Sequence, residues 1–97
     1  MIAVSDLNES HLALALITDA LFCSELETGS TPTSPELTAA IRKALESHRG
    51  WNCRTRTVAA AFANTPAYAV EREAWCRELA EQALGSADLM SVLDAFM

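Results

Sequence analysis

Aromatic residues, glycine and proline are scarce in this 97-residue chain, whereas alanine is abundant. The chain has six aromatic residues, three glycines and three prolines against 18 alanines, and it has no strand-like run of β-branched residues. Because alanine favours helices, whereas β-branched and aromatic residues favour strands, this composition argues against a sheet. A chain of this length has room for one hydrophobic core. We therefore expect a single all-α domain over residues 1–97.

Long hydrophobic runs and early basic residues are missing as well. The longest apolar stretch, "LALALITDALFC", is interrupted by Thr18 and Asp19 and is shorter than the ~20 residues that a membrane span needs. Residues 1–10 carry two acids and no base, and the first Lys or Arg is Arg42, so no targeting peptide is visible. We expect a cytoplasmic protein that does not enter a membrane. Three cysteines, an odd number in a chain without an export signal, predict free thiols.

Charge is unevenly distributed along the chain, whose net charge is −6. Residues 1–36 hold six acids and no base, and residues from 57 onward hold six acids and two bases. Residues 37–56, in contrast, hold five bases and one acid. The chain is therefore an acidic protein with one basic block in its middle.

Capping residues divide the chain into helices. Ser, Thr and Asn are favoured before a helix, and proline at its first position. Such starts are expected near Asn8 or Ser10, at Ser34, at Asn52, at Thr65 and at Ser86. The corresponding ends are expected near Thr28, His48, Asn64 and Gly85, with the linker "GSTPTSP" over residues 29–35. The pattern predicts a compact bundle of four main helices plus a short C-terminal helix.

The first expected helix is apolar on two sides. Leu12 and Leu16 share one face, whereas Leu14, Ile17 and Leu21 lie on nearly the opposite face. A helix of this kind is either central in its own fold or shared with a partner chain, and the sequence leaves both interpretations open. The apolar C-terminal helix must likewise dock on the body or on a partner.

The stretch "HRGWNCRTRTVAAAF" places Arg54 and Arg56 in the first turn of the third expected helix. Cations are unfavourable beside the positive end of a helix, so an anion should lie nearby. One interpretation is an anion-binding site made of Asn52, Arg54 and Arg56. The other is internal pairing with acids of the first or fourth helix, such as Glu71 or Glu78.

Arg72 falls on the face of the fourth helix that should be buried, between Tyr68 and Trp75. A buried arginine needs a carboxylate or an aromatic ring. Asp19, which interrupts an apolar face of the first helix, or a glutamate is the expected partner, with an aromatic lid over the pair. Alternatively, the Tyr68, Arg72 and Trp75 trio is typical of an interface hot spot.

Several segments resemble a group of small helical proteins from high-GC bacteria. These segments are "DALFCSELETGSTPTSPELTAAIRKAL", "GWNCRTRTVAAAF", "TP" and "REAWCRELA", and the resemblance covers most of residues 19–80. The positions that carry it are Ala20, Leu21, Phe22, Pro32, Thr33, Gly50, Cys53, Arg72 and Trp75. This chain departs from the group by placing Trp51 and Asn52 between Gly50 and Cys53 and by carrying more cysteine. The resemblance implies a helical fold and a bacterial origin, and it brings no activity.

The leading hypothesis is a non-enzymatic helical protein–protein interaction module, either a homodimer or an accessory or regulatory subunit. The expected partner surface consists of Leu14, Ile17, Leu21, Phe22, Tyr68, Arg72, Trp75, Leu93 and Phe96. No cofactor is expected, because the chain lacks a nucleophile motif, a Gly-rich phosphate loop and paired metal-ligand motifs.

Two alternative functions remain. A DNA- or RNA-associated regulator would use the basic block of Arg42, Lys43, Arg49, Arg54 and Arg56, although the overall acidity opposes it. A thiol-based metal or redox sensor would use Cys23, Cys53 and Cys76, although each lies on a different expected helix.

Overall fold

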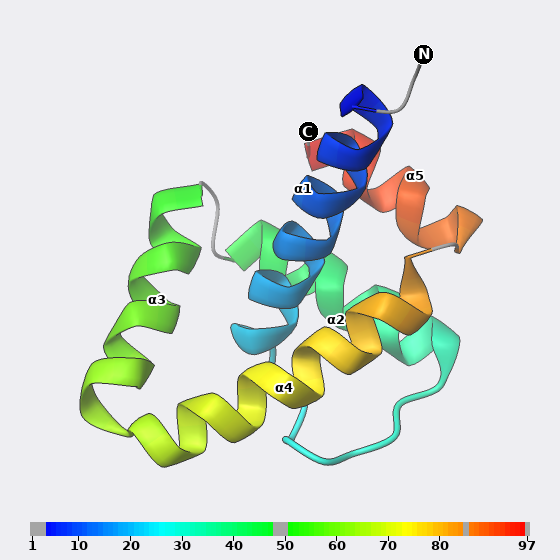
Figure 1. Cartoon of the computed structure of the whole chain (residues 1–97). Coiled ribbons are helices and arrows are strands. Elements are labelled where there is room, and N and C mark those ends of the chain that lie inside the picture. The colour runs from blue at the N-terminus through cyan, green and yellow to red at the C-terminus, as the bar shows by residue number, and fades with distance from the viewer. Residues whose placement is uncertain (1–3, 48–50, 85, 97) are drawn as a thin grey trace.

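Five α-helices account for most of the described residues, and no strand is found among them (Figure 1). The computed structural model describes residues 4–47, 51–84 and 86–96. The helices are α1 (Val4–Phe22), α2 (Ser34–Ser47), α3 (Trp51–Asn64), α4 (Pro66–Ala83) and α5 (Ala87–Phe96). The radius of gyration is 13.1 Å, as expected for a compact chain of this length. The predicted all-α bundle with a short C-terminal helix is confirmed.

Helix α1 lies at the centre of the fold. It contacts α2, α3 and α4, and Figure 1 shows it running between α3 and the other helices. Its second half is buried on several sides, with Leu16, Ile17, Ala20, Leu21 and Phe22 in the core. Most of both apolar faces of α1 is therefore covered within the monomer, as the central-helix interpretation expects, although Leu12 is exposed and Leu14 is only partly buried.

The rest of the core comes from α2, α4 and α5. The helical spacing of Leu37, Ala40, Ile41, Ala44 and Leu45 predicts one buried stripe on α2, and the structure buries these residues except Ala40, which is partly exposed. Helix α5 contacts α2 and buries Leu89, Val92 and Leu93. The C-terminal helix is therefore docked on the body of the monomer.

The buried face of α4 differs from the one expected. It consists of Ala69, Arg72, Cys76, Ala80 and Ala83, whereas Tyr68 is 50% exposed. Small residues in this stripe let the backbones of α4 and α1 approach closely, and a tyrosine ring would keep them apart. Tyr68 therefore lies beside the contact face rather than in it.

Two helix starts differ from the predictions. Helix α1 begins at Val4, before Asn8 and Ser10. Helix α3 begins at Trp51, so Asn52 lies inside its first turn and is not the residue that precedes the helix. His48 follows the apolar pattern of residues 37–45 at helical spacing, which predicts its partial burial, but it lies outside the described residues.

The end of α1 and the start of α2 differ as well. Helix α1 ends at Phe22 and not near Thr28, and Gly29, at φ 90°, is a turn of the linker instead of the helix terminator. Thr33, not Ser34, caps α2. The Thr33 amide donates to Glu36 Oε1 at 2.8 Å and the Glu36 amide donates to Thr33 Oγ1 at 3.4 Å. This reciprocal pair is a capping box, which satisfies two amides that a lone Ser34 cap would leave to water.

The capping box predicts that Thr33 and Ser34 contribute differently to stability. Thr33→Ala should lower the free energy of unfolding by about 1 kcal/mol, because it removes the side-chain acceptor at the helix start. Ser34→Ala should change it by less than about 0.5 kcal/mol. Urea denaturation followed by circular dichroism measures both values. Equal losses in the two variants would contradict Thr33 as the cap.

Candidate functional site

Arg72 is the most deeply buried charge among the described residues. Arg72 lies on the buried face of α4, between small residues, and its side chain reaches the C-terminal end of α1. The residue is only 4% exposed. The last carbonyl groups of a helix have no intrahelical partners and carry partial negative charge, so this position favours a cation.

All five N–H groups of the Arg72 guanidinium can be assigned to acceptors. Nε donates to the Phe22 carbonyl at 2.9 Å, and Nη2 donates to the carbonyls of Leu21 (3.2 Å) and Ser24 (3.0 Å). Nη1 donates to the Leu26 carbonyl and to Thr28 Oγ1, both at 2.9 Å. Because a guanidinium has five donors in a fixed fork, these five bonds use its full donor capacity.

Two aromatic rings enclose the same guanidinium. Its Cζ lies 5.6 Å from the centroid of the Phe22 ring and 5.4 Å from that of the Trp75 ring. The Trp75 indole also donates from Nε1 to the Ser30 carbonyl at 3.0 Å. The predicted aromatic lid is present, but the predicted Asp19 partner is wrong. Four carbonyl groups of residues 21–26 and the Thr28 hydroxyl, at the end of α1 and in the linker that follows it (residues 23–33), occupy every donor of Arg72.

Asp19 instead lines a groove between three helices. The groove has a volume of about 330 Å³, and Figure 1 shows α3 meeting α4 at a corner and standing beside α1. The lining residues are Leu14, Ala15, Thr18, Asp19 and Phe22 of α1, Val58 of α3, and Glu73 and Arg77 of α4. We call this the α1–α3–α4 groove.

Apolar side chains form most of the floor and walls of this groove. Phe22 stacks against Phe62 of α3 with ring centroids 6.3 Å apart. Leu14 and Val58 are only partly buried, although both contact the core cluster. The groove therefore leaves apolar surface uncovered next to a carboxylate.

Burial raises the pKa of the Asp19 carboxyl above its ordinary value, and the nearby charge of Glu73 acts in the same direction. The positive charge of Arg54 opposes this effect without reversing it. Among the described residues the ion pairs are Arg77 with Glu73 at 3.0 Å and Lys43 with Glu25 at 2.7 Å, and neither includes Asp19. Burial therefore disfavours the ionised form of Asp19 in this groove.

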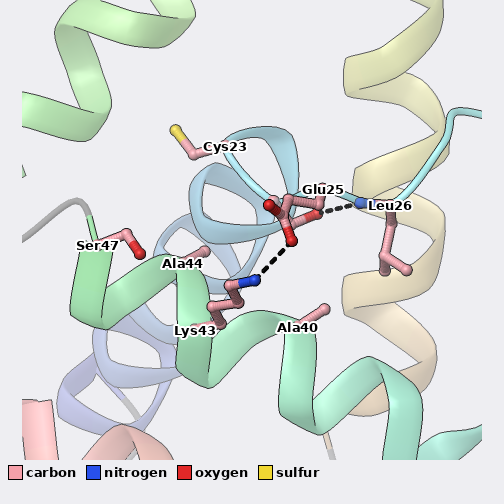
Figure 2. Close-up of a pocket in the computed structure, with 8 residues that line it drawn as sticks. Cys23, Glu25, Leu26, Ala40, Lys43, Ala44 and Ser47 are labelled. Atoms are coloured by element: carbon pink, nitrogen blue, oxygen red, sulfur yellow. Dashed lines mark hydrogen bonds and ion pairs between the residues drawn. The ribbon is translucent and has the colours of Figure 1, made fainter.

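A second groove lies where the segment directly after α1 passes α2. It also has a volume of about 330 Å³, and it is lined by Cys23, Ser24, Glu25, Leu26, Ala40, Lys43, Ala44 and Ser47. Figure 2 shows Lys43 reaching from α2 to the Glu25 carboxylate. That contact lowers the pKa of Glu25. In this groove Lys43 and Glu25 form an ion pair, whereas the ion pairs between described residues do not include Asp19.

Some residues of the predicted partner surface lie in the core of the monomer, and others are accessible to solvent. Ile17, Leu21 and Leu93 lie fully in the core of the monomer, so no partner can contact them without unfolding it, whereas Phe22 is buried but also lines the α1–α3–α4 groove. Leu14 and Trp75 are partly buried, and Tyr68 is exposed. These residues do not form one surface: Leu14 lines the α1–α3–α4 groove, whereas the Trp75 indole donates to the linker carbonyl of Ser30. The side chain of Phe96 lies outside the described residues.

The predicted anion-binding residues are separated as well. Arg54 is 7% exposed and its charge acts on Asp19, an acid of α1, whereas Arg56 is exposed. Glu71 and Glu78, the acids of α4 considered from the sequence, are both exposed. Arg54 and Arg56 therefore do not converge on one surface, and the side chain of Asn52 lies outside the described residues.

The described cysteines occupy different environments. Cys76 is fully buried, and burial raises the pKa of its thiol to about 12, although the charge of Arg72 acts in the opposite direction. Cys23 is partly exposed, and the side chain of Cys53 lies outside the described residues. Within the described part of the chain, no three His, Cys, Asp or Glu side chains lie close enough together to hold a metal ion.

Comparisons with protein-family models, with curated proteins and with solved structures found no match to this chain. In the described part of the structure, none of the helices combines the length and the apolar character that crossing a membrane requires.

The α1–α3–α4 groove was not predicted as such. The signal that points to it is Asp19, an acid on an otherwise apolar face of the first helix. Sequence reasoning assigned that acid to Arg72, since helical spacing says nothing about which carbonyl groups a guanidinium can reach. The groove becomes visible only when α3 is placed beside α1.

The Arg72 contacts predict that a lysine cannot replace this residue. Arg72→Lys keeps the charge but removes the fork of donors, leaving buried carbonyls unpaired, and should lower the free energy of unfolding by about 3 kcal/mol or more. Arg77→Lys, at an exposed ion pair, is the matched control and should cost less than about 0.5 kcal/mol. Chemical denaturation measures both variants. A small loss for Arg72→Lys would show that the carbonyl contacts contribute little.

Burial of Cys76 predicts a thiol that reacts only when the protein unfolds. At pH 9, near the ordinary thiol pKa, Cys76 stays protonated in the folded chain, so iodoacetamide should label it far more slowly than Cys23. The free energy of unfolding should also fall as the pH rises from 9 towards 12, because the unfolded chain then releases a proton that the folded chain retains. Peptide mass spectrometry reads the labelling, and rapid native labelling of Cys76 would contradict this environment.

Proposed function

We propose that this chain is a non-enzymatic helical interaction module that receives a helix of a partner protein in the α1–α3–α4 groove. The observation that carries the proposal is the uncovered apolar lining of this groove beside Asp19. Leu14 and Val58 are only partly buried there, although both extend the hydrophobic core. A partner side chain placed on them would continue that core outward.

The arrangement favours an accessory subunit over a homodimer. The homodimer hypothesis relied on surplus apolar surface of the first and last helices, and Ile17, Leu21 and Leu93 are covered inside the monomer. Leu14 is the member of that predicted surface which remains accessible at the groove. A second copy can still occupy the groove, and the experiment below distinguishes that case.

The nucleic-acid alternative receives less support from the geometry. Its basic block requires several cations on one surface. Arg54 is buried and Lys43 is paired with Glu25, whereas Arg42 and Arg56 are exposed on different helices. The proposal therefore rests on a protein partner.

Site-specific photo-crosslinking tests the proposed function directly. A photoreactive amino acid at Ala15, an exposed residue that lines the groove, should form a defined protein adduct in the cells from which the sequence comes. The same amino acid at Ala39, exposed on α2 away from the groove, is the matched control and should form none. Mass spectrometry identifies the adduct, and light scattering over a wide concentration range shows whether the partner is a second copy. Absence of an adduct at Ala15, or equal adducts at both positions, would contradict the proposal.

A further inference from the structure

An exposed stripe on α1 leads into the α1–α3–α4 groove. Leu12, Ala15 and Asp19 are spaced three and four residues apart, so they lie on one side of the helix. Leu12 is 49% exposed and Ala15 is also exposed. From Leu12 to Phe22, at 1.5 Å per residue, this surface extends for roughly 15 Å along α1.

The shape of this surface matches a helix better than a small molecule. The groove itself, at about 330 Å³, lies at the low end of the roughly 300–1,000 Å³ of ligand pockets. Leu12 lies beyond the groove, about one helical turn before Ala15, where a ligand enclosed in the groove would not cover it. A helix with apolar residues at intervals of three and four inserts some side chains in the groove and rests others on Leu12.

The charges in the groove indicate which polar residue the partner carries. Glu73 is already paired with Arg77 on the rim, so the carboxylate left for a partner is that of Asp19. Arg54, from α3, supplies positive charge nearby, but burial dominates at Asp19 and leaves its ionised form disfavoured. A cation brought by a partner would stabilise the ionised form and would gain from the partly desolvated setting.

We infer that the occupant of the α1–α3–α4 groove is an amphipathic helix that sets apolar side chains on Leu12, Leu14 and Val58 and a lysine or arginine against Asp19. The inference rests on the proposed function, because it specifies the partner of the same groove. It disfavours an acidic helix, which would place a third negative charge beside Asp19 and Glu73.

Two synthetic peptides provide the probes. One is a labelled amphipathic helix of leucine, alanine and lysine, and the other is the same sequence with glutamate in place of lysine. Fluorescence anisotropy measures their affinity for the full chain. The lysine peptide should bind and the glutamate peptide should not.

Three variants separate groove binding from general attraction to an acidic protein. Asp19→Asn, which keeps the shape of the side chain, should weaken the lysine peptide about tenfold. Glu81→Gln, an equal change of charge at an exposed site of α4 that does not line the groove, should leave its affinity unchanged. Leu12→Ser should weaken binding by removing the exposed apolar contact. Circular dichroism confirms that each variant is folded.

Each remaining outcome overturns the inference in a recognisable way. Equal weakening by Asp19→Asn and Glu81→Gln would mean that the net charge attracts the peptide. If both peptides bind equally and Leu12→Ser weakens both, the groove binds helices regardless of their charge. That result would overturn the inference about a basic helix but would leave the proposed function intact. Failure of both peptides to bind would also overturn the inference, while a crosslink confined to Ala15 would still support the proposed function.

Discussion

The guanidinium of Arg72 lies against the C-terminal end of α1, where a helix leaves its last carbonyl groups without partners. By donating to Leu21 and Phe22 and then to the linker carbonyls of Ser24 and Leu26, it satisfies both the helix end and the turn that follows. Water reaches this buried position poorly, so without the guanidinium these groups would be desolvated and unpaired. The end of α1, the path of the linker and the crossing of α4 all depend on this contact.

The neighbouring elements are arranged to make that contact possible. The alanines and the cysteine on the buried face of α4 bring its backbone close to α1, so that a side chain from α4 reaches the helix end. Trp75, one turn further along α4, holds the linker at Ser30, and the capping box at Thr33 starts α2 three residues later. The position of α2 in the core therefore follows from where α4 anchors the linker.

The sequence predicted those features of the fold that depend on residues close together in the chain. The helix start at Pro66 and most of the buried stripe of α2 depend on neighbouring residues, and the structure agrees with them. The start of α2 was predicted only to within one residue, because Thr33 rather than Ser34 is its cap. The end of α1 and the partner of Arg72 depend on a residue some fifty positions away, about which capping rules and helical periodicity contain no information. The groove was missed for the same reason, although Asp19 was correctly recognised as an unusual acid on an apolar face.

The way Arg72 is satisfied also determines the chemistry of the groove. A buried arginine usually requires a carboxylate, and Asp19 was the partner expected from the sequence. Because backbone carbonyls and Thr28 take all five donors, no carboxylate is needed at the end of α1. Asp19 therefore remains in the groove, where burial disfavours its charge and Arg54 compensates only in part. A cation that arrives from outside stabilises this carboxylate more than it would an exposed one, since the surrounding apolar walls exclude the water that would otherwise screen the pair.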